Sequence, residues 1–223
     1  MRPVVKGAIP LDINNTPKVF TDHKQAKRDL IGRIGSYCSY CERKISSNLA
    51  IEHVKPKGIN PALRLVWDNF LLACTNCNST KGSANLNLVH YYWPDQHNTF
   101  IAFEYRNTGF LSPSKNPIVD SIIAKNTIEL TGINVIDISD EASDTRWEER
   151  LETWFLAEEE LFDFENSTRG NNEIQGIIRT AIGHGFWSIW MKVFENHVDV
   201  QDALIAAFTG TFTECRTTNI DRG

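Results

Sequence analysis

Apolar residues recur at two different spacings along the chain, and the spacing changes from one segment to the next. An extended arm over residues 1–20 contains three prolines. Apolar positions three and four residues apart then predict a helix over 23–34. Short apolar runs predict strands over 50–54 and 67–73, separated by a loop with proline and glycine, and a short helix follows over 78–86.

Helical spacing dominates the rest of the chain after a hairpin predicted over 99–111. Apolar residues every three or four positions predict five further helices, over 117–131, 145–165, 173–182, 186–197 and 199–208. Aromatic residues and a proline interrupt the pattern near 90–98, so we expect one domain over 1–97 and a second, mainly helical domain over 98–223. The fold class predicted is α+β.

One helical stripe has two interpretations. Apolar side chains on one face of 186–197 form either part of the core or a groove for a partner, and amphipathic helices more often bury such a face internally. The stripe consists of Trp187, Trp190, Met191 and Phe194.

Composition is that of an ordinary globular protein. The chain has 223 residues, of which 41% are hydrophobic and 23% charged. The sequence contains no apolar run long enough to cross a bilayer and begins without an apolar signal core, so we expect a cytoplasmic bacterial protein that needs no membrane.

Charge is distributed unevenly. The net charge is −5, but residues 1–100 carry 13 Lys or Arg and 7 Asp or Glu, whereas residues 101–223 carry 10 and 21. A basic N-terminal region suits contact with phosphates, and an acidic C-terminal region suits a partner protein rather than nucleic acid. The basic face of the helix over 23–34 is either a phosphate-contacting surface or simply solvated.

Four of the five cysteines form two CxxC pairs, Cys38 with Cys41 and Cys74 with Cys77. Thiolates bind zinc in tetrahedral sets of four, so these residues predict a structural zinc site. A redox function is disfavoured because a thioredoxin-like motif needs a single pair in a βαβ unit. The remaining Cys215 is expected to be an ordinary thiol.

The segment between and after the CxxC pairs resembles the HNH endonucleases with a four-cysteine zinc site. Glu52-His53, Asn69 and Asn78 match the order of that family's motif. The resemblance implies a ββα-metal, treble-clef-like nuclease core with a zinc knuckle. Two departures are Glu52, where Asp is common, and Asn78, where many members have His.

The chemistry follows from the side chains. His53 is expected to act as the general base on water, and Asn69 to hydrogen-bond back to the His53 segment and orient the ring. Glu52 and Asn78 offer oxygen ligands for a catalytic Mg²⁺ or Mn²⁺, and Lys81 can reach a phosphate. Because neighbouring strand residues point to opposite faces, we expect that a twist or bulge, or the loop beginning at Val54, brings Glu52 and His53 together.

A second resemblance extends over most of the chain. The chain is similar to the PtuB nucleases of Septu and related retron anti-phage systems, which implies a hetero-oligomer with a PtuA-like ATPase that controls cleavage of DNA or another nucleic acid. The sequence itself contains no P-loop. The similar segments are Met1 to Gly7, Tyr40 to Ile45, Glu52 to Lys57, Trp67 to Asn69, Thr127 to Asn134 and Phe186 to Cys215.

Two other functions stay open. A stand-alone restriction-type HNH nuclease would be expected to have a basic recognition module, which the acidic second half disfavours. A non-catalytic zinc module that binds nucleic acid would need neither the Glu52-His53 pair nor the asparagines. His90 and His97 could form a further metal or base site, although isolated histidines are usually structural.

Overall fold

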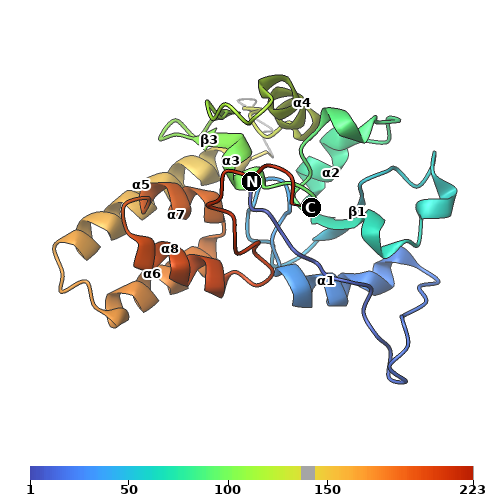
Figure 1. Ribbon diagram of the computed structural model, residues 1–223, viewed down its shortest axis with the longest axis horizontal. Helices are drawn as coiled ribbons and strands as arrows, with labels where there is room; N and C mark the ends of the chain where they lie inside the picture. The colour runs from blue at the N-terminus through green and yellow to red at the C-terminus, as the bar shows by residue number, and fades with distance from the viewer. Residues whose placement is uncertain (137–143, 223) are drawn as a thin grey trace.

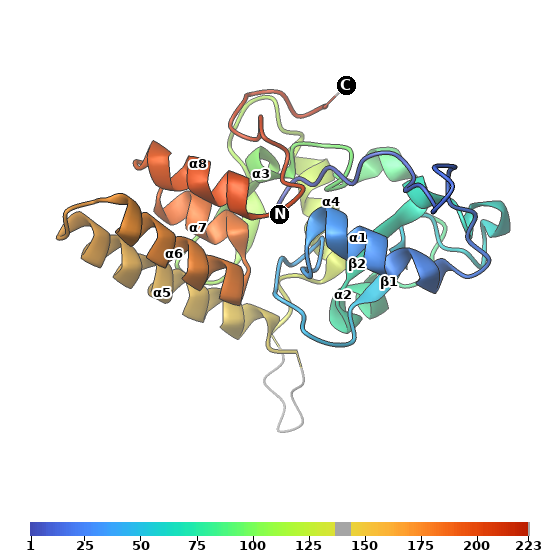
Figure 2. The ribbon, with the colours of Figure 1, turned by 90° about the horizontal axis from the view of Figure 1, so that it is seen from below.

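The computed structural model describes residues 1–136 and 144–222. Its N-terminal part is a two-stranded antiparallel hairpin flanked by helices (Figure 1). The elements are the 3-10 turn η1 (His23–Ala26), helix α1 (Lys27–Ile34), strands β1 (Ala50–His53) and β2 (Phe70–Ala73), and helix α2 (Thr75–Lys81). Figure 2 shows α1 and α2 beside the hairpin. The turn η1 contacts β1, and α1 contacts β2.

The hairpin is paired in regular register along its whole length. Glu52 lies opposite Leu71, and His53 lies opposite Phe70. The bulge expected at Glu52-His53 is therefore wrong, because backbone pairing continues through His53 without an extra residue, whereas the alternative, that the loop beginning at Val54 brings the two side chains together, stays a prediction. Successive side chains leave opposite faces of a regular strand, so Glu52 and His53 diverge.

The helix predicted near 78–86 is present but displaced, because it begins at Thr75 and ends at Lys81. Its start is capped by Cys74, whose Sγ accepts a hydrogen bond from the Cys77 amide. Its end is Gly82, which has a φ of +63° that favours glycine. The second CxxC pair is therefore part of the helix start rather than a loop that precedes it.

Two other predicted elements differ at their beginnings. Residues Trp67–Asn69, predicted as strand, form the 3-10 turn η3, and the strand starts only at Phe70. The predicted helix over 117–131 begins at Ser121, because the Asp120 carboxylate caps the amides of Ile122 and Ile123. Two more 3-10 turns are η2 (Pro61–Leu63) and η4 (Leu88–His90).

The C-terminal part is mainly helical, as predicted. The hairpin expected over 99–111 is displaced, because residues Thr99–Ala102 form a helical turn and the strands come later. The elements are α3 (Thr99–Ala102), β3 (Phe103–Tyr105), β4 (Leu111–Pro113), α4 (Ser121–Thr131), α5 (Arg146–Glu165), α6 (Asn171–His184), α7 (Trp187–Val193) and α8 (Val198–Ala207).

A single cluster of buried apolar residues continues through both parts of the chain. The stripe of Trp187, Trp190, Met191 and Phe194 is fully buried, so the interpretation of this stripe as core is confirmed. The loop after Cys41 packs against the α6–α7 junction, where the Glu42 carbonyl accepts a hydrogen bond from the Phe186 amide at 3.0 Å. The boundary between residues 97 and 98 stays a prediction. Among the described residues, no helix combines the length and the apolar character needed to span a bilayer.

Candidate metal centre and nuclease site

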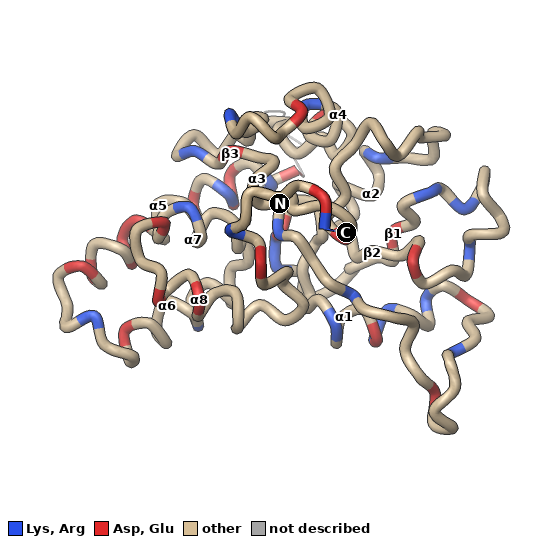
Figure 3. Tube along the Cα trace, in the orientation of Figure 1, with Lys and Arg blue, Asp and Glu red and all other residues tan. Residues whose placement is uncertain are grey.

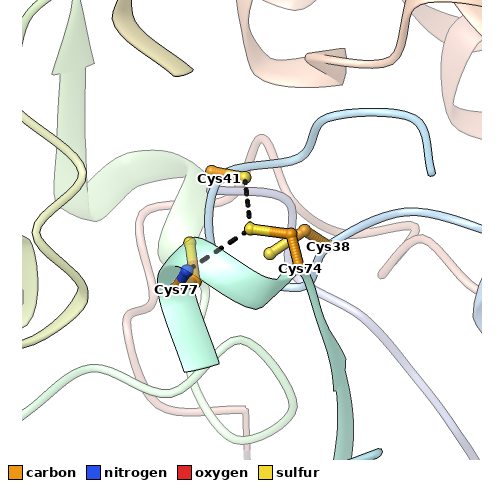
Figure 4. Close-up of side chains that lie close together, drawn as sticks. All are labelled: Cys38, Cys41, Cys74 and Cys77. Atoms are coloured by element: carbon orange, nitrogen blue, oxygen red, sulfur yellow. Dashed lines mark hydrogen bonds between the residues drawn. The ribbon is translucent and has the colours of Figure 1, made fainter. Parts of the chain in front are cut away.

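The four CxxC cysteines converge on one point (Figure 4). Their sulfur atoms all lie within 4.8 Å of one another, and all four residues are buried. Cys41 Sγ and Cys74 Sγ are 3.7 Å apart. Zinc–sulfur bonds of about 2.3 Å in a tetrahedron place the sulfurs about 3.8 Å apart, so this spacing fits a structural zinc ion.

The hairpin and its flanking segments provide the ligands. Cys38 and Cys41 lie in the loop between α1 and β1, Cys74 directly follows β2, and Cys77 lies in the first turn of α2. A zinc ion would therefore join the loop, the end of the second strand and the helix. Glu52 and His53 lie at the end of β1, whereas Ala50 at its start pairs with Ala73, the residue before Cys74.

Two buried arginines of α5 lie beside the thiolates, and the sequence analysis missed both. Arg146 Nη1 donates to Cys77 Sγ at 3.1 Å, and the same guanidinium donates to the carbonyls of Thr131 and Gly132. Four thiolates around Zn²⁺ would leave a net charge of −2, and the Arg146 guanidinium, which also pairs with Asp144 at 2.6 Å, donates a charged hydrogen bond to this cluster. Arg146 and Arg150 are four residues apart, on the buried face of α5. This spacing was the only feature of the sequence that could have indicated that both arginines are buried.

His53 is largely buried and has one ring nitrogen engaged. Nε2 lies 3.0 Å from the Arg64 carbonyl oxygen. Because a carbonyl can only accept, Nε2 carries the proton and Nδ1 keeps its lone pair. Burial lowers the pKa of His53 below its ordinary value, and the nearby charges of His23, Lys57 and Lys81 act in the same direction. The neutral ring can therefore accept a proton at Nδ1.

Glu52 points away from the His53 ring and toward α2. Its Oε1 lies 2.7 Å from Lys81 Nζ, with both side chains almost completely buried. The Lys81 ammonium also donates to the His53 carbonyl at 3.0 Å. Burial raises the pKa of Glu52, and the Lys81 charge opposes this. The phosphate contact of Lys81 stays a prediction, since protein oxygens surround the ammonium here.

Asn69 holds the loop after His53 rather than the His53 ring. Its amide accepts from the Lys55 amide at 2.7 Å and donates to the carbonyls of Lys55 and Leu63. The loop closed in this way contains Arg64, whose carbonyl contacts His53. Asn78 is partly exposed and lies three residues before Lys81 in α2, so both leave the same helix face.

His23 is a second histidine at this site that the sequence analysis did not select. Its ring centroid lies 5.0 Å from that of His53, although the two residues belong to different elements. The only signal in the sequence was its place at the start of the basic helix over 23–34, which says nothing about its distance from His53.

The other candidates lie elsewhere. His90 is exposed, and His97 Nδ1 accepts a hydrogen bond from the Trp93 amide at 2.9 Å. Burial raises the pKa of Cys215 to about 11, which keeps it a thiol. Within the described residues, the four cysteines are the only group of three or more His, Cys, Asp or Glu side chains arranged to hold a metal.

Residues 38–84 match the family model of the HNH endonucleases. The chain therefore contains an HNH endonuclease domain in this segment. The matched residues include the hairpin, α2, all four zinc-type cysteines and both Glu52 and His53. The family implies a nucleic-acid substrate and suggests nuclease activity. A comparison with curated proteins found no match.

Proposed function

We propose that this protein is a metal-dependent HNH endonuclease that hydrolyses phosphodiester bonds of DNA. One observation supports the proposal most strongly: the HNH match coincides with a four-cysteine hairpin and helix that holds a neutral histidine with one free ring nitrogen. A structural zinc alone would not require that histidine.

His53 is the general base in this proposal. Nδ1 takes a proton from the attacking water, and the Arg64 carbonyl stabilises the resulting imidazolium through Nε2–H. Asn69 is a positioning residue, because it fixes both ends of the loop that carries Arg64. Removal of Asn69 would misplace the carbonyl and allow the ring to rotate.

Glu52 and Asn78 are the proposed ligands of a divalent ion. Glu52 Oε1 is buried, and its partner is the Lys81 ammonium 2.7 Å away. A carboxylate that already pairs with a cation in a buried site fits an ion of the Mg²⁺ or Mn²⁺ type, which typically takes one or two carboxylates and keeps several waters. When bound, such an ion neutralises charge on the phosphate and on the leaving oxygen. Lys81 would have to release Glu52 for the ion to bind there.

A His53→Ala variant tests the proposal. The wild-type protein should cut plasmid or phage DNA only when Mg²⁺ or Mn²⁺ is added, and the variant should lose about 10²- to 10⁴-fold in rate. Zinc content and the circular dichroism spectrum should be unchanged, because the His53 side chain does not contact the cysteines. Cutting by the variant at the wild-type rate would refute the proposal.

We further propose that the nuclease acts in a cytoplasmic anti-phage complex with a PtuA-like ATPase. Support comes from the resemblance to the PtuB nucleases and from the acidic residues along α5 (Figure 3). Phe155 and Phe162 on this helix are 50% and 67% exposed among acidic neighbours. In this view 1–97 is the nuclease domain and 98–223 the docking domain. Purified protein and the ATPase should co-elute, and Phe155→Ser with Phe162→Ser should separate them.

A second candidate function is a zinc module that binds nucleic acid without cutting it. The ion pair between Glu52 and Lys81 favours this alternative, because it occupies the carboxylate and leaves Glu52 and His53 on opposite strand faces. DNA binding with no cutting under any divalent ion, and the same DNA affinity for wild type and His53→Ala, would establish it.

A further inference from the structure

His23, Lys57 and Arg64 surround the edge of His53, and neither Lys57 nor His23 has a role in the site described so far. The His23 and His53 ring centroids are 5.0 Å apart. Lys57 Nζ lies 3.5 Å from His23 Nε2. Arg64 belongs to the same loop as Lys57, and both side chains are exposed. The cationic side chains of this loop and the His23 ring of a separate element therefore lie together beside the proposed general base.

The positive charge in this place is only weakly compensated. The nearest carboxylate to His23 is that of Asp22, with Oδ1 3.3 Å from His23 Nδ1, and the Asp22 side chain is 49% exposed. Burial lowers the pKa of His23, and the charges of Lys57 and Arg64 lower it further, whereas Asp22 acts in the opposite direction. An anion placed among these groups would remove their mutual repulsion.

The anchoring of His23 shows that its position does not depend on its own side chain. Asp22 and Gln25 form a capping box at the start of η1. Asp22 accepts from the Lys24 amide at 2.8 Å, and Gln25 accepts from the Thr21 amide at 2.9 Å. The His23 side chain is 13% exposed, so it reaches the surface next to the His53 ring.

We propose that His23 and Lys57 bind a phosphate of the DNA backbone next to the phosphodiester bond that is hydrolysed by the water activated by His53. The inference rests on the proposed nuclease function for its location but concerns a separate step, the binding of the substrate. Lys57 contributes a charge at the surface, and His23 contributes Nε2, which lies 3.5 Å from Lys57 Nζ. Together they place the backbone against His53, and neither takes part in the transfer of the proton from water.

Binding can be measured separately from cutting. The probe is a fluorescein-labelled 20-base-pair duplex DNA, followed by anisotropy with zinc-loaded protein and no added Mg²⁺ or Mn²⁺. His23→Ala and Lys57→Ala should each weaken binding about three- to tenfold, and Lys57→Ala should reduce the slope of log K against log salt by about one. The matched controls are His90→Ala and Lys125→Ala, which remove a histidine and a lysine outside the site and should bind like wild type.

The outcomes separate this inference from the nuclease proposal. Loss of cutting in His53→Ala, with wild-type binding in both His23→Ala and Lys57→Ala, would overturn the inference and leave the nuclease proposal intact. Weaker binding in both variants, with cutting unaffected by His53→Ala, would support the phosphate site and refute the nuclease. A His23→Gln variant, which keeps a hydrogen-bonding side chain of similar size, guards against a folding defect and should recover part of the affinity.

Discussion

The ion pair between Glu52 and Lys81 makes a quantitative prediction about metal binding. The oxygen and nitrogen are 2.7 Å apart, and the side chains are 4% and 1% exposed. At an effective dielectric constant of about 20, two unit charges at this distance attract by about 6 kcal/mol, before the cost of desolvation is subtracted. Truncation of one partner leaves the other charge buried alone, which typically costs about 3–5 kcal/mol.

A Lys81→Met variant should therefore lose about 3–5 kcal/mol in the free energy of unfolding at neutral pH. The loss should depend on pH. Burial raises the pKa of Glu52 already in the wild type, and removal of the ammonium raises it further. A carboxyl group whose folded pKa exceeds its unfolded pKa contributes less stability as pH rises above its unfolded pKa, so the variant should become progressively less stable than wild type as pH rises above the ordinary pKa of a glutamate.

The assay is urea unfolding of zinc-loaded protein in buffer without chelator. A double variant with Glu52→Gln should be more stable than the sum of the single effects predicts, with a coupling energy of about 2–3 kcal/mol. If Glu52 binds a divalent ion, Mg²⁺ at about ten times its dissociation constant should stabilise Lys81→Met by about 1.4 kcal/mol, and the gain should vanish in the double variant. Purely additive effects, or a single-variant loss below about 1 kcal/mol, would refute the reasoning.

Three further predictions concern residues around this pair. Arg146→Met should release zinc faster to a colorimetric chelator than wild type or the exposed control Arg179→Met, because the buried thiolates lose their hydrogen-bonded cation. Asn69→Ala should lose about 2–3 kcal/mol for its three hydrogen bonds and expose the following loop to trypsin, and an unchanged digestion pattern would contradict this. Burial lowers the pKa of His97 below 6.5, and Nδ1 accepts a hydrogen bond from the Trp93 amide, so wild type should lose stability as pH falls through 6.5. His97→Gln has no side chain that can be protonated at this position, so urea unfolding should show a smaller loss over the same pH range.

The sequence identified the zinc ligands because their arrangement is largely local. Two residues between cysteines bring both sulfurs of a pair to one ion, and four thiolates complete the tetrahedron. The hairpin between the pairs also followed from its apolar runs. The start of α2 could not be found in this way, because the cap is a cysteine sulfur that accepts from the Cys77 amide, a role usually taken by Ser, Thr, Asp or Asn.

The remaining parts of the site depend on packing between distant segments. Lys81 was expected to reach a phosphate, because nothing local shows that α2 packs it against Glu52. His23 reaches His53 only through the contact of η1 with β1. Arg146 meets Cys77 across 69 residues of chain. A residue list in the right order predicts the chemistry of such a site, but it does not predict which charges face each other.

These long-range contacts also explain why the acidic segment matters to the HNH domain. Arg146 joins the Cys77 sulfur to the carbonyls of Thr131 and Gly132 at the end of α4. Cys77 in turn lies in the first turn of α2, whose last residue, Lys81, contacts Glu52 and the His53 carbonyl. A displacement of α5 would therefore act on the thiolates first and on Glu52 through only one turn of helix. A partner that binds the exposed face of α5 could therefore affect Glu52 through the contacts of Arg146 with Cys77 and of Lys81 with Glu52. These contacts do not include the His53 ring.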